Sequence, residues 1–114
     1  MERRLAAILA ADMVGYSRLM EADETGTLSI LKSLRSELLE PNMREHHGRI
    51  VKTTGDGFLS GFASAAEAVQ CAVEIQQSMS ERNASVAHDN QIEFRIGINI
   101  GETGSRAMTS TAMG

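Results

Sequence analysis

The chain has 114 residues, of which 42% are hydrophobic and 23% are charged, as expected for one globular domain with its own core. Its formal net charge of −4 argues against nucleic acid as the main partner, because a surface that binds phosphate backbones is usually basic. A single cysteine, Cys71, excludes an intrachain disulfide and fits a reducing, cytoplasmic setting, and no apolar run is long enough to span a bilayer.

The N-terminal segment contains the continuous apolar run 5–11, which ends at Asp12. Such a run predicts a strand that is buried on both faces. The basic residues before it also resemble the start of a signal peptide. We favour the strand, because the run is short, ends on an acidic residue and is followed by no convincing cleavage region.

Residues 17–40 are predicted to be mostly helical, because leucines recur at helix spacing, namely Leu28, Leu31, Leu34, Leu38 and Leu39. Pro41 either interrupts this helix or starts a second one in its first turn, and Gly48 ends that second helix. The neighbours His46 and His47 do not share a helix face, so we interpret them as a capping or solvated pair rather than a metal site.

Residues 49–53 and 58–62 read as two short strands joined by a turn that contains Asp56-Gly57, which is typical of a hairpin. A helix follows, and Ser64 with Glu67 forms the pattern of a capping box at its start. Its predicted apolar stripe consists of Ala65, Ala68, Val69, Ala72, Ile75 and Met79. Cys71 is expected to be a small buried residue within this helix.

Residues 92–100 alternate between apolar and polar side chains, which predicts a strand with one buried face. The predicted element order is therefore β-α-(α)-β-β-α-β. This order matches an α/β (α+β) fold of the ferredoxin-like, split βαβ type. In that topology the first strand and the hairpin lie together near the centre of the sheet, which would place Asp12 close to Asp56.

Two carboxylates follow strand-like runs and have glycines nearby: Asp12 precedes Gly15, and Asp56 lies between Gly55 and Gly57. Each aspartate alone could be an ordinary turn residue. Side by side, their oxygens would suit hard cations such as Mg²⁺ or Mn²⁺, while the glycines would let the backbone approach a phosphate. The pair therefore predicts a metal-dependent nucleotide site.

Three ordered sequence blocks resemble the catalytic domain of class III adenylate and guanylate cyclases, particularly the bacterial adenylate cyclase type. They are A-D-M-V-G-Y-S at 11–17, G-R-I-V-K-T-T-G-D-G-F at 48–58 and R-I-G-I-N-I-G at 95–101. The similarity covers residues 3–101, so we expect a cyclase domain over 1–101. It implies conversion of ATP to 3′,5′-cyclic AMP and pyrophosphate, in cyclic-nucleotide signal transduction. It also implies a homodimer or a dimer with another cyclase domain.

The resemblance implies that Asp12 and Asp56 hold two Mg²⁺ or Mn²⁺ ions, with the backbone carbonyl of Met13 as a further ligand. In the family, these ions activate the ribose 3′-hydroxyl and neutralise the triphosphate during attack on the α-phosphate. Lys52 stands where the family reads the purine base, and lysine there accompanies adenine. The backbone N–H groups that would bind the β- and γ-phosphates belong to Val14, Gly15, Tyr16 and Ser17.

Residues 102–114 do not continue the resemblance, because they lack the family's D-I-Y-G-like and V-N-x-A-x-R-like motifs. The second motif supplies the Asn and Arg that stabilise the transition state across the dimer. We expect a disordered tail, a fold that is incomplete at its C-terminus and a chain with weak or no activity. One choice of codons for 108–114 encodes D-I-Y-G-D-G in another reading frame, so a frameshift is one hypothesis for the tail.

Two other functions fit the cyclase-like residues that this chain contains. The chain could be a non-catalytic nucleotide-binding or regulatory domain that pairs with a complete cyclase, or a non-functional fragment that folds poorly. A polymerase palm domain also uses two carboxylates. The acidic charge, the small size and the blocks around Asp12 and Asp56 argue against the palm domain.

Overall fold

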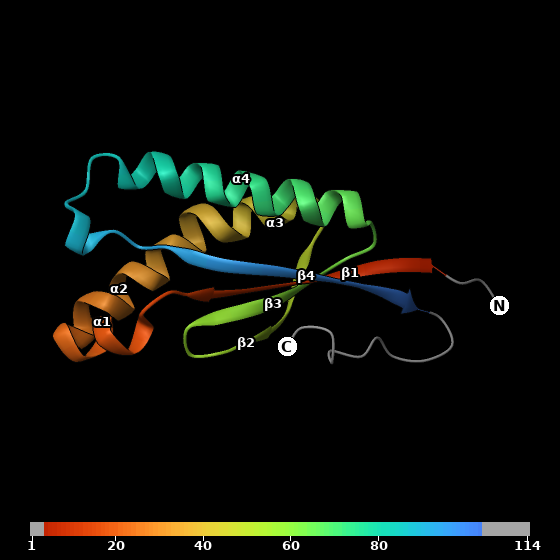
Figure 1. The fold of residues 1–114 in the computed structure, drawn as a ribbon. Helices are drawn as coiled ribbons and strands as arrows, with labels where there is room; N and C mark the ends of the chain where they lie inside the picture. Colours follow the sequence, from red (N-terminus) through yellow and green to blue (C-terminus); the bar gives the residue numbers. More distant parts are fainter. Residues whose placement is uncertain (1–3, 104–114) are drawn as a thin grey trace.

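The computed structural model of the chain describes residues 4–103, which fold into one antiparallel sheet with helices packed on it (Figure 1). The strands are β1 (Arg4–Met13), β2 (Arg49–Thr53), β3 (Gly57–Phe62) and β4 (Phe94–Thr103). The helices are α1 (Tyr16–Ala22), α2 (Glu24–Leu34), the π-helical η1 (Arg35–Leu39), α3 (Glu40–Glu45), α4 (Ala65–Asn83) and the 3-10 turn η2 (His88–Asn90).

The strand order in the described sheet is β2-β3-β1-β4, which confirms the predicted ferredoxin-like topology. Helices α3 and α4 lie on one face of the sheet, and α1 and α2 lie at the end where β1 finishes (Figure 1). Strand β4 runs through Thr103, so it includes the first two residues of the segment predicted to be a tail. The rest of that segment, from 104 onward, lies outside the described residues.

Strand β1 is central and pairs with β3 on one side and with β4 on the other. In this register Asp12 lies opposite Gly57 on β3 and opposite Arg95 on β4. The close approach of β1 to β3 explains the glycine, because a Cβ on Gly57 would lie 1.9 Å from the carbonyl oxygen of Ala11. The register therefore places one candidate metal ligand at the centre of three adjacent strands.

The core lies between the sheet and the helices, and the odd-numbered residues of β1 contribute Ala7, Leu9, Ala11 and Met13 to it. Helix α4 buries Ala68, Cys71, Ile75 and Met79, which confirms the prediction for Cys71. Val69 is 49% exposed, so the predicted stripe was wrong at this position, and Leu28 of α2 is 44% exposed. The buried face of α4 is therefore narrower than its apolar pattern.

Pro41 lies in the first turn of α3, which is the second of the two predicted alternatives. The junction with the preceding helix is the π-helical segment η1 rather than a break. A proline has no N–H to donate and crowds the carbonyl four residues earlier, and the wider π-helical turn accommodates both effects. The side chain of Asn42 also donates a hydrogen bond to the carbonyl oxygen of Leu38, at 2.9 Å.

The end of α3 differs from the prediction that Gly48 would end it. His47 adopts the left-handed conformation, with φ of 63°, and the N–H of Gly48 donates to the carbonyl of Met43 at 2.7 Å. The N–H of His47 donates to Arg44 at 3.2 Å, which completes a Schellman motif. Position 48 needs a glycine for a different reason: there is no room for a side chain, because a Cβ would lie 2.3 Å from the Phe62 ring.

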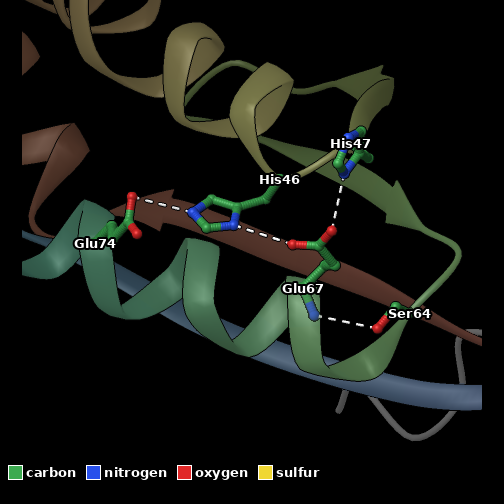
Figure 2. A network of polar contacts seen from close by, with 5 residues as sticks. All are labelled: His46, His47, Ser64, Glu67 and Glu74. Carbon is green, nitrogen blue, oxygen red and sulfur yellow. Dashed lines mark hydrogen bonds and ion pairs between the residues drawn. The ribbon is translucent and has the colours of Figure 1, made fainter.

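The prediction of a capping or solvated pair holds in part: His46 is the C-cap of α3 but is buried, whereas His47 is exposed. The His46 side chain turns toward α4, where only 7% of the residue is exposed (Figure 2). Ser64 accepts a hydrogen bond from the N–H of Glu67, as a capping box requires. The Glu67 carboxylate, however, contacts both histidines rather than the start of its own helix (Figure 2). Adjacency in sequence could not reveal this contact between two helices.

Among residues 4–103, none of the helices combines the length and the apolar character that a membrane crossing requires.

Candidate functional site

The candidate site is an open cleft of about 470 Å³ on the sheet, lined by residues of β1, β3, β4 and the β2–β3 turn. Its polar residues are Asp12, Thr54, Asp56 and Arg95. Ala10 and Asp12 of β1 line the cleft, together with Ala11, whereas Leu9 and Met13 on the other face of the strand are buried in the core. The cleft therefore lies on the sheet face opposite α4.

The structure brings Asp12 and Asp56 to the same cleft. Asp12 is the penultimate residue of β1, and its cross-strand neighbour Gly57 directly follows Asp56. The N–H of Met13 donates to the backbone carbonyl of Asp56 at 2.8 Å, which fixes the turn against the end of β1. The carboxylates thus come from two segments whose relative position is set by backbone hydrogen bonds.

Arg95 is a site residue that the sequence analysis missed. Its Nε and Nη2 atoms donate to the two carboxylate oxygens of Asp12, each at 3.2 Å. The hydrogen bonds to Asp12, with a smaller contribution from the charge of Asp56, raise the pKa of Arg95 above its usual value. The Arg95 side chain is 73% exposed, so this ion pair is weak and can exchange partners.

Thr54 is the second residue that the structure adds. Its hydroxyl lies 3.4 Å from Oδ1 of Asp56, within the β2–β3 turn, and its N–H donates to the carbonyl of Gly57 at 2.8 Å. Both contacts hold the turn that presents Asp56. The signal in the sequence was the Thr-Gly-Asp-Gly run itself, in which a short hydroxyl side chain precedes the turn aspartate.

The segment that joins β1 to α1 lies beside these carboxylates. Gly15 adopts a left-handed conformation, with φ of 69°, and turns the chain into the first turn of α1 at Tyr16 and Ser17. A Cβ on Gly55 would lie 4.0 Å from the Tyr16 hydroxyl oxygen, so α1 begins next to the β2–β3 turn. The Tyr16 and Ser17 amides belong to the N-terminal turn of α1, where backbone N–H groups favour anions.

Met13 and Val14 have different positions in this segment. The Met13 side chain is buried, so only its backbone could contribute a metal ligand. The N–H of Val14 donates to the carbonyl of Glu93 at 2.9 Å, because β4 begins beside it. That N–H is already bonded within the fold, and a role for Val14 in binding phosphate stays a prediction.

Lys52 lies in β2 at the edge of the sheet and is exposed. It is paired with Leu59, a residue that lines the cleft, and directly paired residues of antiparallel strands share a face. Lys52 therefore lies on the same face as the cleft, beyond its lining residues. A lysine in this position can reach a ligand that extends outward from the two carboxylates.

Comparison with known proteins identifies relatives of this chain. A family model described as the adenylate and guanylate cyclase catalytic domain matches residues 2–113. A protein of Rhizobium meliloti (strain 1021) named "Putative adenylate cyclase 3" is 52% identical over 100 residues. The match covers 88% of this chain and 17% of the relative.

Solved structures of cyclases are also similar to this chain. An adenylate/guanylate cyclase/hydrolase from Silicibacter pomeroyi superposes with a TM-score of 0.80 at 54% identity, over 89% of this chain and 59% of that one. The guanylyl cyclase Cya2 superposes with a TM-score of 0.72 at 29% identity, over 89% and 56%. The chain thus spans less than two thirds of the length of each of these relatives.

Proposed function

The chain belongs to the adenylate and guanylate cyclase catalytic domain family, and on this basis we propose that it binds ATP together with two divalent cations. The proposed reaction of the whole enzyme is conversion of ATP to 3′,5′-cyclic AMP and pyrophosphate. The observation that carries the proposal is the meeting of Asp12 and Asp56 at one cleft beside the start of α1.

The donor set at the cleft fits Mg²⁺ or Mn²⁺. Asp12 and Asp56 offer carboxylate oxygens, and the backbone carbonyl of Met13 is the proposed additional ligand. When bound, such ions lower the pKa of the ribose 3′-hydroxyl and neutralise charge on the triphosphate. The two aspartates would hold the ions, and the amides at the start of α1 would bind the outer phosphates.

The guanidinium of Arg95 already provides a positive charge beside the Asp12 carboxylate. If a metal ion binds Asp12, the guanidinium loses its partner and remains beside a negatively charged triphosphate. We therefore assign Arg95 as a phosphate-binding residue that neutralises Asp12 when no metal is bound. The exposure of Arg95 supports this role, because an exposed ion pair costs little to separate.

Lys52 is the proposed base-reading residue. Its ammonium group can donate to N1 of adenine, whereas guanine presents an N1–H donor at the same place. The adenylate cyclase name of the Rhizobium meliloti relative agrees with this preference. The proposed substrate is therefore ATP rather than GTP.

The proposal includes a dimer, formed with a second copy or with another cyclase domain. In the family, an Asn and an Arg from a V-N-x-A-x-R-like motif act across the dimer, and residues 102–114 contain no such motif. Removing groups that stabilise developing charge typically costs about two to three orders of magnitude in rate. We therefore expect weak or no activity from this chain alone.

A complementation assay tests the proposal. The chain would be mixed with the Silicibacter pomeroyi cyclase domain carrying Asn at the two positions that align with Asp12 and Asp56. Cyclic AMP production that requires both proteins and Mn²⁺ would show that this chain supplies the metal-binding half. The control is the same mixture with Asp12→Asn/Asp56→Asn in this chain, which should be inactive.

The second candidate function is a non-catalytic nucleotide-binding or regulatory domain. The residues that support the first proposal also support this one, because their proposed roles are the binding of metal ions, phosphates and the base. Saturable Mn²⁺-ATP binding without activity in the mixture would support it. Absence of both binding and activity would contradict both functions and favour a non-functional fragment.

A further inference from the structure

A second cluster of ionisable side chains lies away from the cleft, where the end of α3 meets α4 (Figure 2). Glu45 and His46 come from the end of α3, and Glu74 comes from α4. Each offers one ligand atom, and these atoms lie within 4.8 Å of one another. The cluster therefore joins two helices that are separated in sequence by the whole β2–β3 hairpin.

The orientation of the His46 ring is set from α4. Its Nδ1 lies 3.2 Å from Oε1 of Glu67, and its Nε2 lies 3.0 Å from Oε1 of Glu74 (Figure 2). Nε2 is buried, and its contact with Glu74 is an ion pair without the alignment of a hydrogen bond. The ring thus has carboxylate oxygens at both nitrogens.

When Nδ1 of His46 donates its N–H to Glu67, a cation is needed between Nε2 and Glu74. A neutral imidazole has only one N–H, and donating it to Glu67 leaves a lone pair on Nε2. A lone pair and a carboxylate oxygen repel at 3.0 Å unless a cation lies between them. That cation is either a proton, which makes the ring an imidazolium, or a metal ion that binds both atoms.

Several features favour a metal ion. Metal-binding histidines commonly donate their other N–H to a carboxylate, as His46 can donate to Glu67. In a tetrahedral zinc site, neighbouring N and O ligands lie about 3.4 Å apart, which follows from bond lengths near 2.1 Å. The observed separation of Nε2 and Oε1 is only slightly shorter. Glu45 is exposed, so it can complete the ligand set and leave a place for water.

We propose that Glu45, His46 and Glu74 form a binding site for Zn²⁺ or a similar transition-metal ion, with Glu67 orienting the imidazole. An imidazole with carboxylates suits such ions, whereas the cleft offers oxygen ligands only. The site is therefore distinct from the one at Asp12 and Asp56 in position and in metal preference. A bound ion would join the end of α3 to α4 and stabilise the folded chain.

The test is titration of the purified chain with Zn²⁺ in a calorimeter, using the Asp12→Asn/Asp56→Asn background to remove binding at the cleft. We expect one Zn²⁺ per chain, with affinity at least about ten-fold lower in His46→Gln and in Glu45→Gln. Glu45 is exposed, so its substitution leaves the packing unchanged and separates ligand loss from misfolding. The visible absorption of bound Co²⁺ gives a second readout of the ligand geometry.

Two matched variants serve as controls. Glu81→Gln removes an exposed carboxylate of α4 outside the cluster, and His47→Asn removes the neighbouring exposed imidazole with a residue that tolerates positive φ. Both should bind Zn²⁺ as the background does. If no saturable binding occurs, or if Glu45→Gln binds normally, the proposed three-ligand site is wrong. Loss of binding only in His47→Asn would show adventitious binding and would also overturn it.

Discussion

Asp12 and Arg95 face each other across β1 and β4, with both oxygens of the carboxylate bound by one guanidinium at 3.2 Å. One of the two candidate metal ligands therefore already has a cationic partner. A metal ion must displace that partner, so metal binding and the position of Arg95 are coupled. Removing the Arg95 charge should therefore change the affinity for the metal ion alone and the affinity for the metal–nucleotide complex in opposite directions.

Replacing Arg95 with Gln should strengthen the binding of Mn²⁺ alone, because the competing cation at Asp12 is removed. The same variant should weaken the binding of Mn²⁺-ATP about ten-fold or more, because a charged hydrogen bond to phosphate is lost. Calorimetry of each ligand would measure both effects. A decrease in both affinities would contradict the exchange of partners that we propose for Arg95.

Replacing Asp56 with Asn should weaken metal-dependent nucleotide binding and leave the fold intact. The backbone carbonyl that accepts from Met13 is unchanged by this substitution, so the turn should keep its position. We expect at least a ten-fold lower affinity for Mn²⁺-ATP, because the variant lacks one of two anionic ligands. Asp89→Asn, at an exposed position in η2, is the matched control and should bind normally.

Replacing Lys52 with Glu should lower the affinity for Mn²⁺-ATP by about ten- to a hundred-fold, the range expected for a hydrogen bond that involves a charged group. Binding of Mn²⁺-GTP should fall less, because Glu can accept from the guanine N1–H. Lys52 is exposed on an edge strand, so stability should change little. Equal losses for both nucleotides would exclude base reading by this residue.

Gly57→Ala should destabilise the chain by about 2–3 kcal/mol, because its Cβ would lie 1.9 Å from the carbonyl oxygen of Ala11. Strands β1 and β3 would have to separate to make room. Gly55→Ala, two residues earlier, would meet nothing closer than the Tyr16 hydroxyl at 4.0 Å, so it should be tolerated. Urea unfolding of the two variants measures the difference. Equal stability of the two variants would show that the close approach of β1 to β3 does not require a glycine at position 57.

Cys71 should react slowly with iodoacetamide at pH 8 in the folded chain and quickly after unfolding in urea. Burial raises the pKa of the Cys71 thiol from 9.0 to about 11, so the reactive thiolate is scarce in the folded chain. Between these two values the unfolded thiol ionises while the folded one does not. This group should therefore lower stability as pH rises from 9 to 11, and the slope should be smaller in Cys71→Ala.

The sequence was sufficient for the topology, because the alternation in β4, the capped apolar stripe of α4 and the Asp-Gly turn before β3 fix the element order, and the apolar run of β1 fits that order as a buried strand. It also placed Asp12 and Asp56 together, since that topology makes their strands neighbours. Arg95 was missed because alternation shows which face a residue occupies, while pairing with Asp12 depends on the register between strands. The burial of His46 was missed for a similar reason, because it depends on the contact between α3 and α4.

The position of the site on the sheet has a consequence for folding errors. Asp12, Gly57 and Arg95 lie abreast on three strands, and neighbouring side chains of each strand point to opposite faces. If β1 slipped by one residue, Asp12 would move under the helices, and Ala11 or Met13 would take its place. Such a chain could keep its secondary structure and much of its compactness and still have no metal site. Circular dichroism alone would not distinguish it from the correct fold, whereas binding of Mn²⁺ would.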